Sequence, residues 1–109
     1  YNKAFGFTQK LLTPEKDYAE LDTGSTTLAF ANYSVAEYDG VGLTKANASK
    51  PPASFEIVFV TTDIKATYKL ALDYGATNVK EPTQKPWGQT VAYVRDLNGY
   101  LIEVCTAVG

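Results

Sequence analysis

The chain has 109 residues, of which 45% are apolar and 20% charged, and its net charge is −2. This length and composition fit one globular domain, and without a basic run or a long apolar run we expect neither a nucleic-acid partner nor a membrane span. Histidine is absent, which excludes Ser-His-Asp and Cys-His pairs and any histidine-ligated metal site.

The first third of the chain is predicted to form a short helix followed by three strands. In Tyr1–Phe7, residues 1, 4 and 5 share one helical face, and Gly6 is a typical helix terminator. The strands are expected at Phe7–Leu12, Tyr18–Asp22 and Thr26–Asn32, with turns between them.

The next stretch, Ser34–Ala53, is interpreted as a flexible linker. It contains Gly40, Gly42, Pro51 and Pro52 and shows no clear hydrophobic period. We therefore expect no regular element between residues 34 and 53.

The second half begins with a strand, Ser54–Thr61, whose two faces are both largely apolar, so it should be covered on both sides. Thr62 or Asp63 is expected to cap a helix over Ile64–Tyr74. A short strand, Val79–Glu81, and a loop, Pro82–Pro86, follow.

The chain closes with a predicted hairpin. Val91–Arg95 and Tyr100–Cys105 are rich in β-branched and aromatic residues, and Asp96-Leu97-Asn98-Gly99 between them is typical of a tight turn. Strand alternation should place Ile102 and Val104 under a helix and Leu101, Glu103 and Cys105 on the other face. Cys105 is expected to be a small buried side chain. With one cysteine and no signal-peptide pattern, a cytoplasmic protein is the default expectation.

The two halves look like copies of one βαβββ module. A shift of 75 residues places Gly24 on Gly99, Tyr18 on Tyr93 and Leu28 on Glu103. We assign module one to residues 1–33, the linker to 34–53 and module two to 54–109, within a single domain. No counterpart of the strand 54–61 precedes residue 1, so we expect the first strand of module one to be missing from this sequence or supplied from elsewhere.

The closing hairpin resembles that of the vicinal-oxygen-chelate superfamily, which includes glyoxalase I, bleomycin-resistance proteins and extradiol dioxygenases. The resemblance rests on Trp87-Gly88 before a strand, on the turn from Arg95-Asp96 to Gly99, and on Glu103 in the last strand. It implies an α+β fold in which two βαβββ modules form curved mixed sheets with outer helices around a concave cup. It also implies a homodimer, because members commonly pair two chains to complete their cups.

In the metalloenzymes of that superfamily, four ligands lie on the first and last strands of the two modules. Glu103 matches one ligand position, Leu28 does not match another, and Glu56 stands where histidine is most common. Two carboxylates and a leucine make a poor transition-metal site, so we expect no metal and no other cofactor. Magnesium held by Glu56, Glu103 and water is the weaker alternative.

The resemblance favours a metal-free protein that sequesters a small amphipathic compound, and a cationic compound is one candidate. Acidic groups and aromatic rings together suit an organic cation. The alternatives are a metal-dependent enzyme resembling lactoylglutathione lyase or a dioxygenase, and a purely structural domain. Glu103 could equally be an inherited residue hydrogen-bonded to a tyrosine or threonine. The candidate ligand-binding residues are Glu103, Glu56, Trp87, Tyr93, Phe30 and Leu28.

Overall fold

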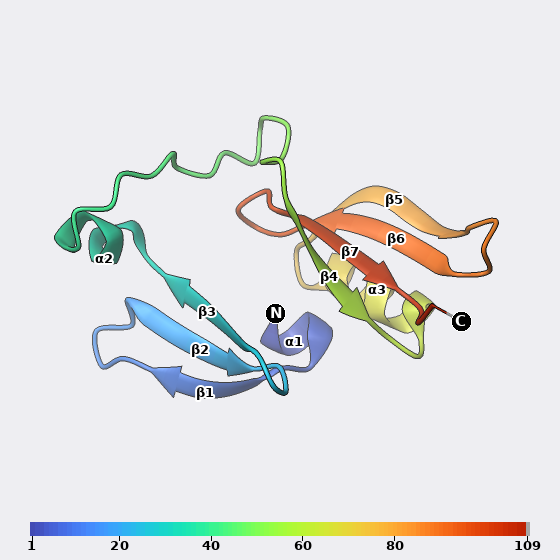
Figure 1. Cartoon of the computed structure of the whole chain (residues 1–109), viewed down its shortest axis with the longest axis horizontal. Helices are drawn as coiled ribbons and strands as arrows, with labels where there is room; N and C mark the ends of the chain where they lie inside the picture. Colours follow the sequence, from blue (N-terminus) through green and yellow to red (C-terminus); the bar gives the residue numbers. More distant parts are fainter. Residues whose placement is uncertain (109) are drawn as a thin grey trace. The chain divides into compact units, whose positions relative to one another are not determined.

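The computed structural model describes residues 1–108 and divides the chain into two compact units (Figure 1). Unit 1 is Tyr1–Lys45, and unit 2 begins at Ala46. The division falls inside the stretch that the sequence analysis interprets as a linker.

Unit 1 contains a three-stranded antiparallel sheet with the strand order β1-β2-β3. The short helix α1 ends at Gly6, whose left-handed conformation (φ 75°) suits a residue without a side chain. The ring of Tyr1, at the start of α1, lies 4.8 Å from the ring of Phe30 on β3. The elements of unit 1 are α1 (Asn2–Phe5), β1 (Thr8–Leu12), β2 (Tyr18–Asp22), β3 (Thr27–Ala31) and α2 (Tyr33–Tyr38).

Helix α2 lies where the sequence analysis expected only linker, so that expectation is wrong for these residues. The side chain of Asn32 caps the helix by accepting a hydrogen bond of 3.0 Å from the backbone N–H of Ser34. No glycine or proline occurs between this cap and Gly40. A local cap therefore starts one and a half turns of helix in a segment whose composition points to a loop.

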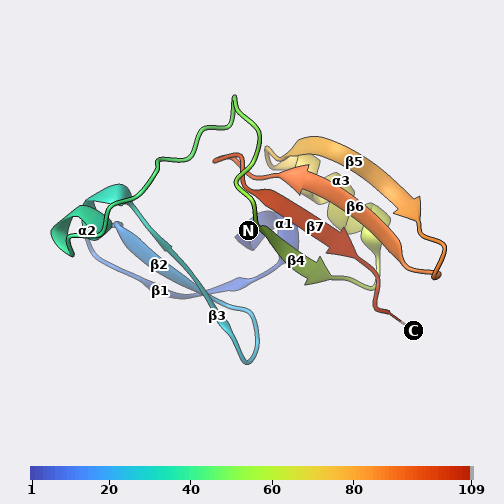
Figure 2. The same cartoon turned by 45° about the horizontal axis from the view of Figure 1, so that its top comes forward.

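Unit 2 contains a four-stranded sheet with the order β4-β7-β6-β5. The pair β4–β7 is parallel, and the pairs β7–β6 and β6–β5 are antiparallel. Helix α3 lies across one face of this sheet (Figures 1 and 2). The elements are β4 (Glu56–Val60), α3 (Ile64–Asp73), β5 (Thr77–Gln84), β6 (Thr90–Arg95) and β7 (Leu101–Cys105).

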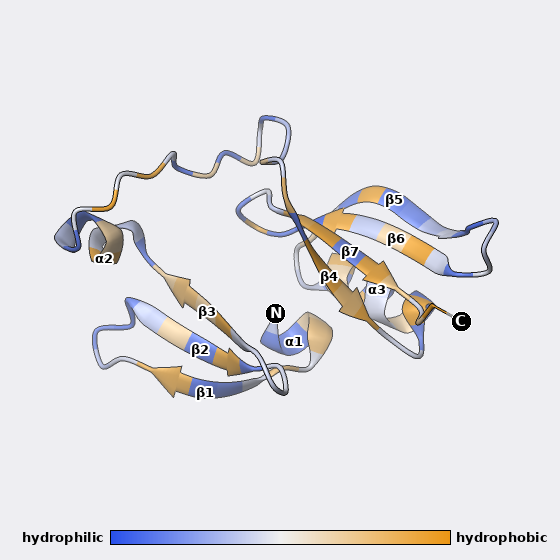
Figure 3. Cartoon of the chain, viewed as in Figure 1, coloured by the Kyte–Doolittle hydropathy of each residue, from blue (hydrophilic) through white to orange (hydrophobic). Residues whose placement is uncertain are grey.

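The hydrophobic core of unit 2 lies between the sheet and α3, and apolar residues mark β4, β6 and β7 (Figure 3). Val94, Ile102 and Val104 are completely buried, as the alternation along the closing strand predicted for the last two. Tyr68 on α3 donates a hydrogen bond of 2.7 Å to Asn78, which pairs with Val94, so this face of the sheet is the one that α3 covers. The predicted cap of α3 is Asp63, which accepts a hydrogen bond from the N–H of Ala66.

Strand β5 is longer than predicted and includes Pro82, which the sequence analysis assigned to a loop. Proline is tolerated because β5 is an edge strand, where one side of the backbone has no partner to hydrogen-bond. The ladder with β6 also shifts register between Lys80 and Thr83, on either side of this proline.

The strand registers correct the alignment of the two repeats by one residue. Residues 23–26 join β2 to β3, whereas residues 96–100, one residue more, join β6 to β7. Counted from these turns, the pair Tyr93–Glu103 corresponds to Glu20–Ala29, while Leu28 pairs with Leu21. Ala29, not Leu28, is therefore the counterpart of Glu103.

Among the residues described, no helix combines the length and the apolar character that crossing a lipid bilayer requires.

Candidate functional site

The candidate site is the face of the unit 2 sheet opposite α3, which we call the open face. The registers arrange its side chains in three rows across the strands. The first row is Glu56, Leu101, Arg95 and Thr77; the second is Val58, Glu103, Tyr93 and Lys80; the third is Val60, Cys105, Val91 and Thr83.

Glu103 and Tyr93 form the centre of the open face. They are directly opposite each other on β7 and β6, and the Tyr93 hydroxyl donates a hydrogen bond of 2.8 Å to Glu103 Oε1. This bond, together with partial burial and the charge of Glu103, raises the pKa of Tyr93 to about 12. The structure thus gives the half-buried carboxylate the tyrosine partner that the sequence analysis considered, and a carboxylate still has further acceptor capacity.

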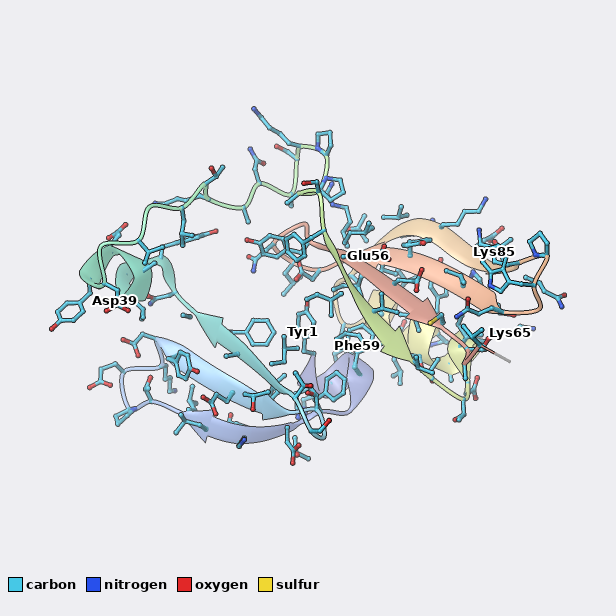
Figure 4. The ribbon with its side chains drawn as sticks, viewed as in Figure 1. Tyr1, Asp39, Glu56, Phe59, Lys65 and Lys85 are labelled. Atoms are coloured by element: carbon cyan, nitrogen blue, oxygen red, sulfur yellow. The ribbon has the colours of Figure 1, made fainter. Side chains whose placement is uncertain are left out.

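Glu56 lies one row away, at the start of β4, with its side chain exposed (Figure 4). Partial desolvation and then the negative charge of Glu103 raise the pKa of its carboxyl group. Within residues 1–108, neither Glu56 nor Glu103 takes part in an ion pair. The open face therefore holds two like charges in neighbouring rows, and its cations Arg95 and Lys80 form no ion pair with either carboxylate in the described part of the chain.

The third row is more apolar. Cys105 is only 2% exposed, which confirms the prediction of a buried thiol, and burial followed by the charge of Glu103 raises its pKa. Val60, on the edge strand, is 65% exposed. An exposed apolar side chain near a partly buried acid, Glu103, is the mixture found in small-molecule sites.

Trp87 lies in the loop between β5 and β6 and is 64% exposed. Its Nε1 donates to Gln89 Oε1 over 2.9 Å, and Gln89 in turn donates to the carbonyl oxygen of Thr106, just beyond β7. Gln89 thus ties the indole to the end of the strand that carries Glu103.

The other two predicted residues, Leu28 and Phe30, lie on β3 in unit 1. They share a face with the buried Leu21, and Phe30 contacts Tyr1 of α1. Both side chains therefore belong to the α1 side of their sheet, and the assignment of Leu28 to the position of Glu103 is wrong because the turn before it is one residue shorter.

Sequence reasoning missed two features of these faces. Tyr18 donates a hydrogen bond of 2.7 Å to Glu20 in unit 1, a second tyrosine–glutamate pair. Arg95 binds two backbone carbonyls in unit 2. Alternation could have placed the tyrosine and the glutamate on one face, but the carbonyl contacts of Arg95 depend on where a distant loop lies.

The donor set does not fit a transition metal. No group of three or more histidine, cysteine, aspartate or glutamate side chains is placed to hold an ion within residues 1–108. Ala29, the counterpart of Glu103, has no side-chain donor at all.

In both units a helix precedes three antiparallel strands, and in unit 2 the additional strand β4 precedes the helix and completes a βαβββ order. The family model described as Glyoxalase/Bleomycin resistance protein/Dioxygenase superfamily matches residues 1–104, and the chain belongs to this superfamily. A comparison with curated proteins gives no match.

Solved structures share the fold at low sequence identity. A glyoxalase-related enzyme from Fulvimarina pelagi has a TM-score of 0.81 at 17% identity, with 98% of this chain and 75% of that one covered. A glyoxalase/bleomycin resistance protein/dioxygenase family enzyme from Burkholderia phytofirmans PsJN has a TM-score of 0.78 at 19% identity, covering 99% and 85%. TioX from Micromonospora sp. ML1 has a TM-score of 0.67 at 24% identity, covering 96% and 82%.

Proposed function

We propose that this protein binds and sequesters a small amphipathic compound carrying a positive charge, and that the compound lies on the open face of unit 2. The observation that supports this most strongly is the pair of carboxylates, Glu56 and Glu103, on one partly apolar face, neither of them in an ion pair within residues 1–108. Bringing two like charges together in a partly desolvated place costs free energy unless a ligand or a donor compensates.

A cationic ligand would remove that cost. Its charged group would contact both carboxylates, while the hydrogen bond from Tyr93 holds the Glu103 side chain in one orientation. The apolar part of the ligand would cover Val58 and Val60, which are 45% and 65% exposed. Tyr93 and Trp87 offer aromatic rings to an organic cation.

The test is a titration calorimetry screen of aromatic ammonium and quaternary ammonium compounds against the unaltered chain. Compounds that bind are then titrated against Glu103→Gln and Glu56→Gln, each of which removes one charge and keeps the shape. We expect each substitution to weaken binding by roughly 1–3 kcal/mol, the scale of a hydrogen bond to a charged group.

Glu81→Gln is the matched control, because Glu81 is an exposed acid on β5 in the same sheet. Its affinity should equal that of the unaltered chain. Equal affinities for all four proteins, or a complete failure of the cations to bind, would refute the proposal.

A further inference from the structure

The segment before β4 is held against the turn between β6 and β7, and Arg95 makes the contacts. We call residues 46–55 the strap. Arg95 Nη2 donates to the carbonyl oxygen of Lys50 over 2.6 Å, and Arg95 Nε donates to the carbonyl oxygen of Gly99 over 2.7 Å. Arg95 is the single arginine in the sequence. One guanidinium group thus joins the strap to the turn.

Two further contacts lie beside this junction. A Cβ atom added to Gly99 would lie 2.7 Å from Ala48 Cα, so the strap passes closer to the turn than any side chain on residue 99 would permit. At the other end of the strap, the rings of Phe55 and Tyr100 are 5.5 Å apart. Pro51 and Pro52 lie between these two points and stiffen the intervening backbone.

Strand β4 needs such an anchor because it is an edge strand that pairs only with β7 among the described strands. Its side chains on the open face are exposed, so side-chain burial on that face specifies its register weakly. The strap leads directly into Glu56, the first residue of β4, which pairs with Leu101 next to Arg95.

We propose that Arg95 is a positioning residue that clamps the strap to the β6–β7 turn and thereby holds Glu56 beside Glu103 on the open face. The planar guanidinium can donate to two carbonyls at once in a fixed geometry. A lysine ammonium is a point charge on a flexible chain and cannot reproduce that geometry. The inference rests on the proposed function only for its ligand-binding consequence.

The first test variant is Arg95→Lys, which keeps the positive charge and loses the double contact. We expect amide hydrogen exchange in the strap and in β4 to accelerate tenfold or more, and exchange in β5 to stay unchanged. An NMR titration of the Glu56 carboxyl group should show its pKa falling toward the ordinary value, since a released β4 exposes this carboxyl to solvent and moves it away from the charge of Glu103. Lys65→Gln is the control, because Lys65 is an exposed cation at the start of α3 (Figure 4).

The second variant, Pro51→Gly with Pro52→Gly, leaves Arg95 intact and loosens only the part of the strap between the clamp and β4. Here exchange should accelerate at residues 55–58 but not at 46–50, and the Glu56 titration should change as in Arg95→Lys. If Arg95→Lys does not fold, this double variant tests by itself whether the strap positions β4 and Glu56.

The proposal is overturned if Arg95→Lys leaves strap exchange unchanged, or if either variant loosens the strap without altering β4 exchange and the Glu56 titration. For a cation that binds the unaltered chain, Arg95→Lys should weaken binding as much as Glu56→Gln does. The double variant that carries both Arg95→Lys and Glu56→Gln should weaken binding no further. Were no cation to bind, the proposed function would fail, while exchange and titration would still test the clamp.

Discussion

The hydrogen bond between Tyr93 and Glu103 should make the unfolding free energy of unit 2 depend on pH. Deleting the Tyr93 hydroxyl should abolish this contribution to the pH dependence. The perturbation is Tyr93→Phe, which keeps the ring and deletes the donor of the 2.8 Å bond. The folded-state pKa of the phenol is raised from 10.0 to about 12. Each unit corresponds to about 1.4 kcal/mol, and because Tyr93 is only partly buried we expect about 1–2 kcal/mol in total.

Whether stability rises or falls with pH depends on whether the folded or the unfolded state loses the phenol proton first. Below pH 10 the phenol is protonated in both states, so the hydrogen bond contributes its full stabilisation. Between pH 10 and 12 the unfolded chain ionises before the folded one, and the contribution is lost as the pH rises through the folded pKa. The difference in unfolding free energy between the unaltered chain and Tyr93→Phe should therefore be largest near neutrality and shrink above pH 10.

The assay is urea unfolding followed by the fluorescence of Trp87, the single tryptophan, which lies in unit 2. Measurements at pH 7, 9, 10.5 and 11.5 sample both regimes, and other groups that titrate in this range cancel in the difference. Tyr38→Phe serves as the control, since Tyr38 is 91% exposed. A difference that stays constant with pH, or that is no larger than for Tyr38→Phe, would refute the reasoning.

Three further predictions concern the turn, the metal and the assembly. Gly99→Ala should destabilise unit 2 by roughly 2–4 kcal/mol in the same assay, since φ is +89° and Ala48 blocks the new Cβ; Gly88→Ala, in the same unit with φ +95° and open space, should cost only about 1 kcal/mol. Elemental analysis of purified protein should find no stoichiometric zinc, nickel or iron, because Ala29 and the lack of histidine leave too few donors; one tightly held ion per chain would contradict this. Light scattering should give a dimer mass, because the sheets have open edges, and a concentration-independent monomer would count against it.

Local signals predicted much of the fold. The turn from Asp96 to Gly99, the Asp63 cap and the buried pair Ile102 and Val104 follow from residues close in sequence, and the structure confirms each of them. The family resemblance, which rested on the same hairpin, is confirmed by the match over residues 1–104.

The errors arose where a single residue or a single cap decides the outcome. A one-residue difference in turn length changes which face a strand residue occupies, so Leu28 was aligned with Glu103 although Ala29 is its counterpart. The side chain of Asn32 caps a helix at the start of a stretch rich in glycine and proline. Strand β5 continues through Pro82 because it lies at the edge of its sheet. Of the candidate site, alternation placed Glu103 on the face away from the helix, but it could not foresee the reach of Arg95 to residue 50.

The parallel pairing of β4 with β7 has a consequence for how the chain folds during synthesis. The antiparallel strands of unit 1 join neighbours in sequence, so that sheet can form as soon as Ala31 is available. Strand β4, by contrast, first meets its partner when Leu101 to Cys105 have been made, some 45 positions after Glu56 to Val60. Until then β4, an apolar strand, has no hydrogen-bonded partner strand. The formation of this long-range pairing should be among the slowest steps of folding. A chain that ends before Leu101 would therefore leave both edges of β4 unpaired and prone to aggregation.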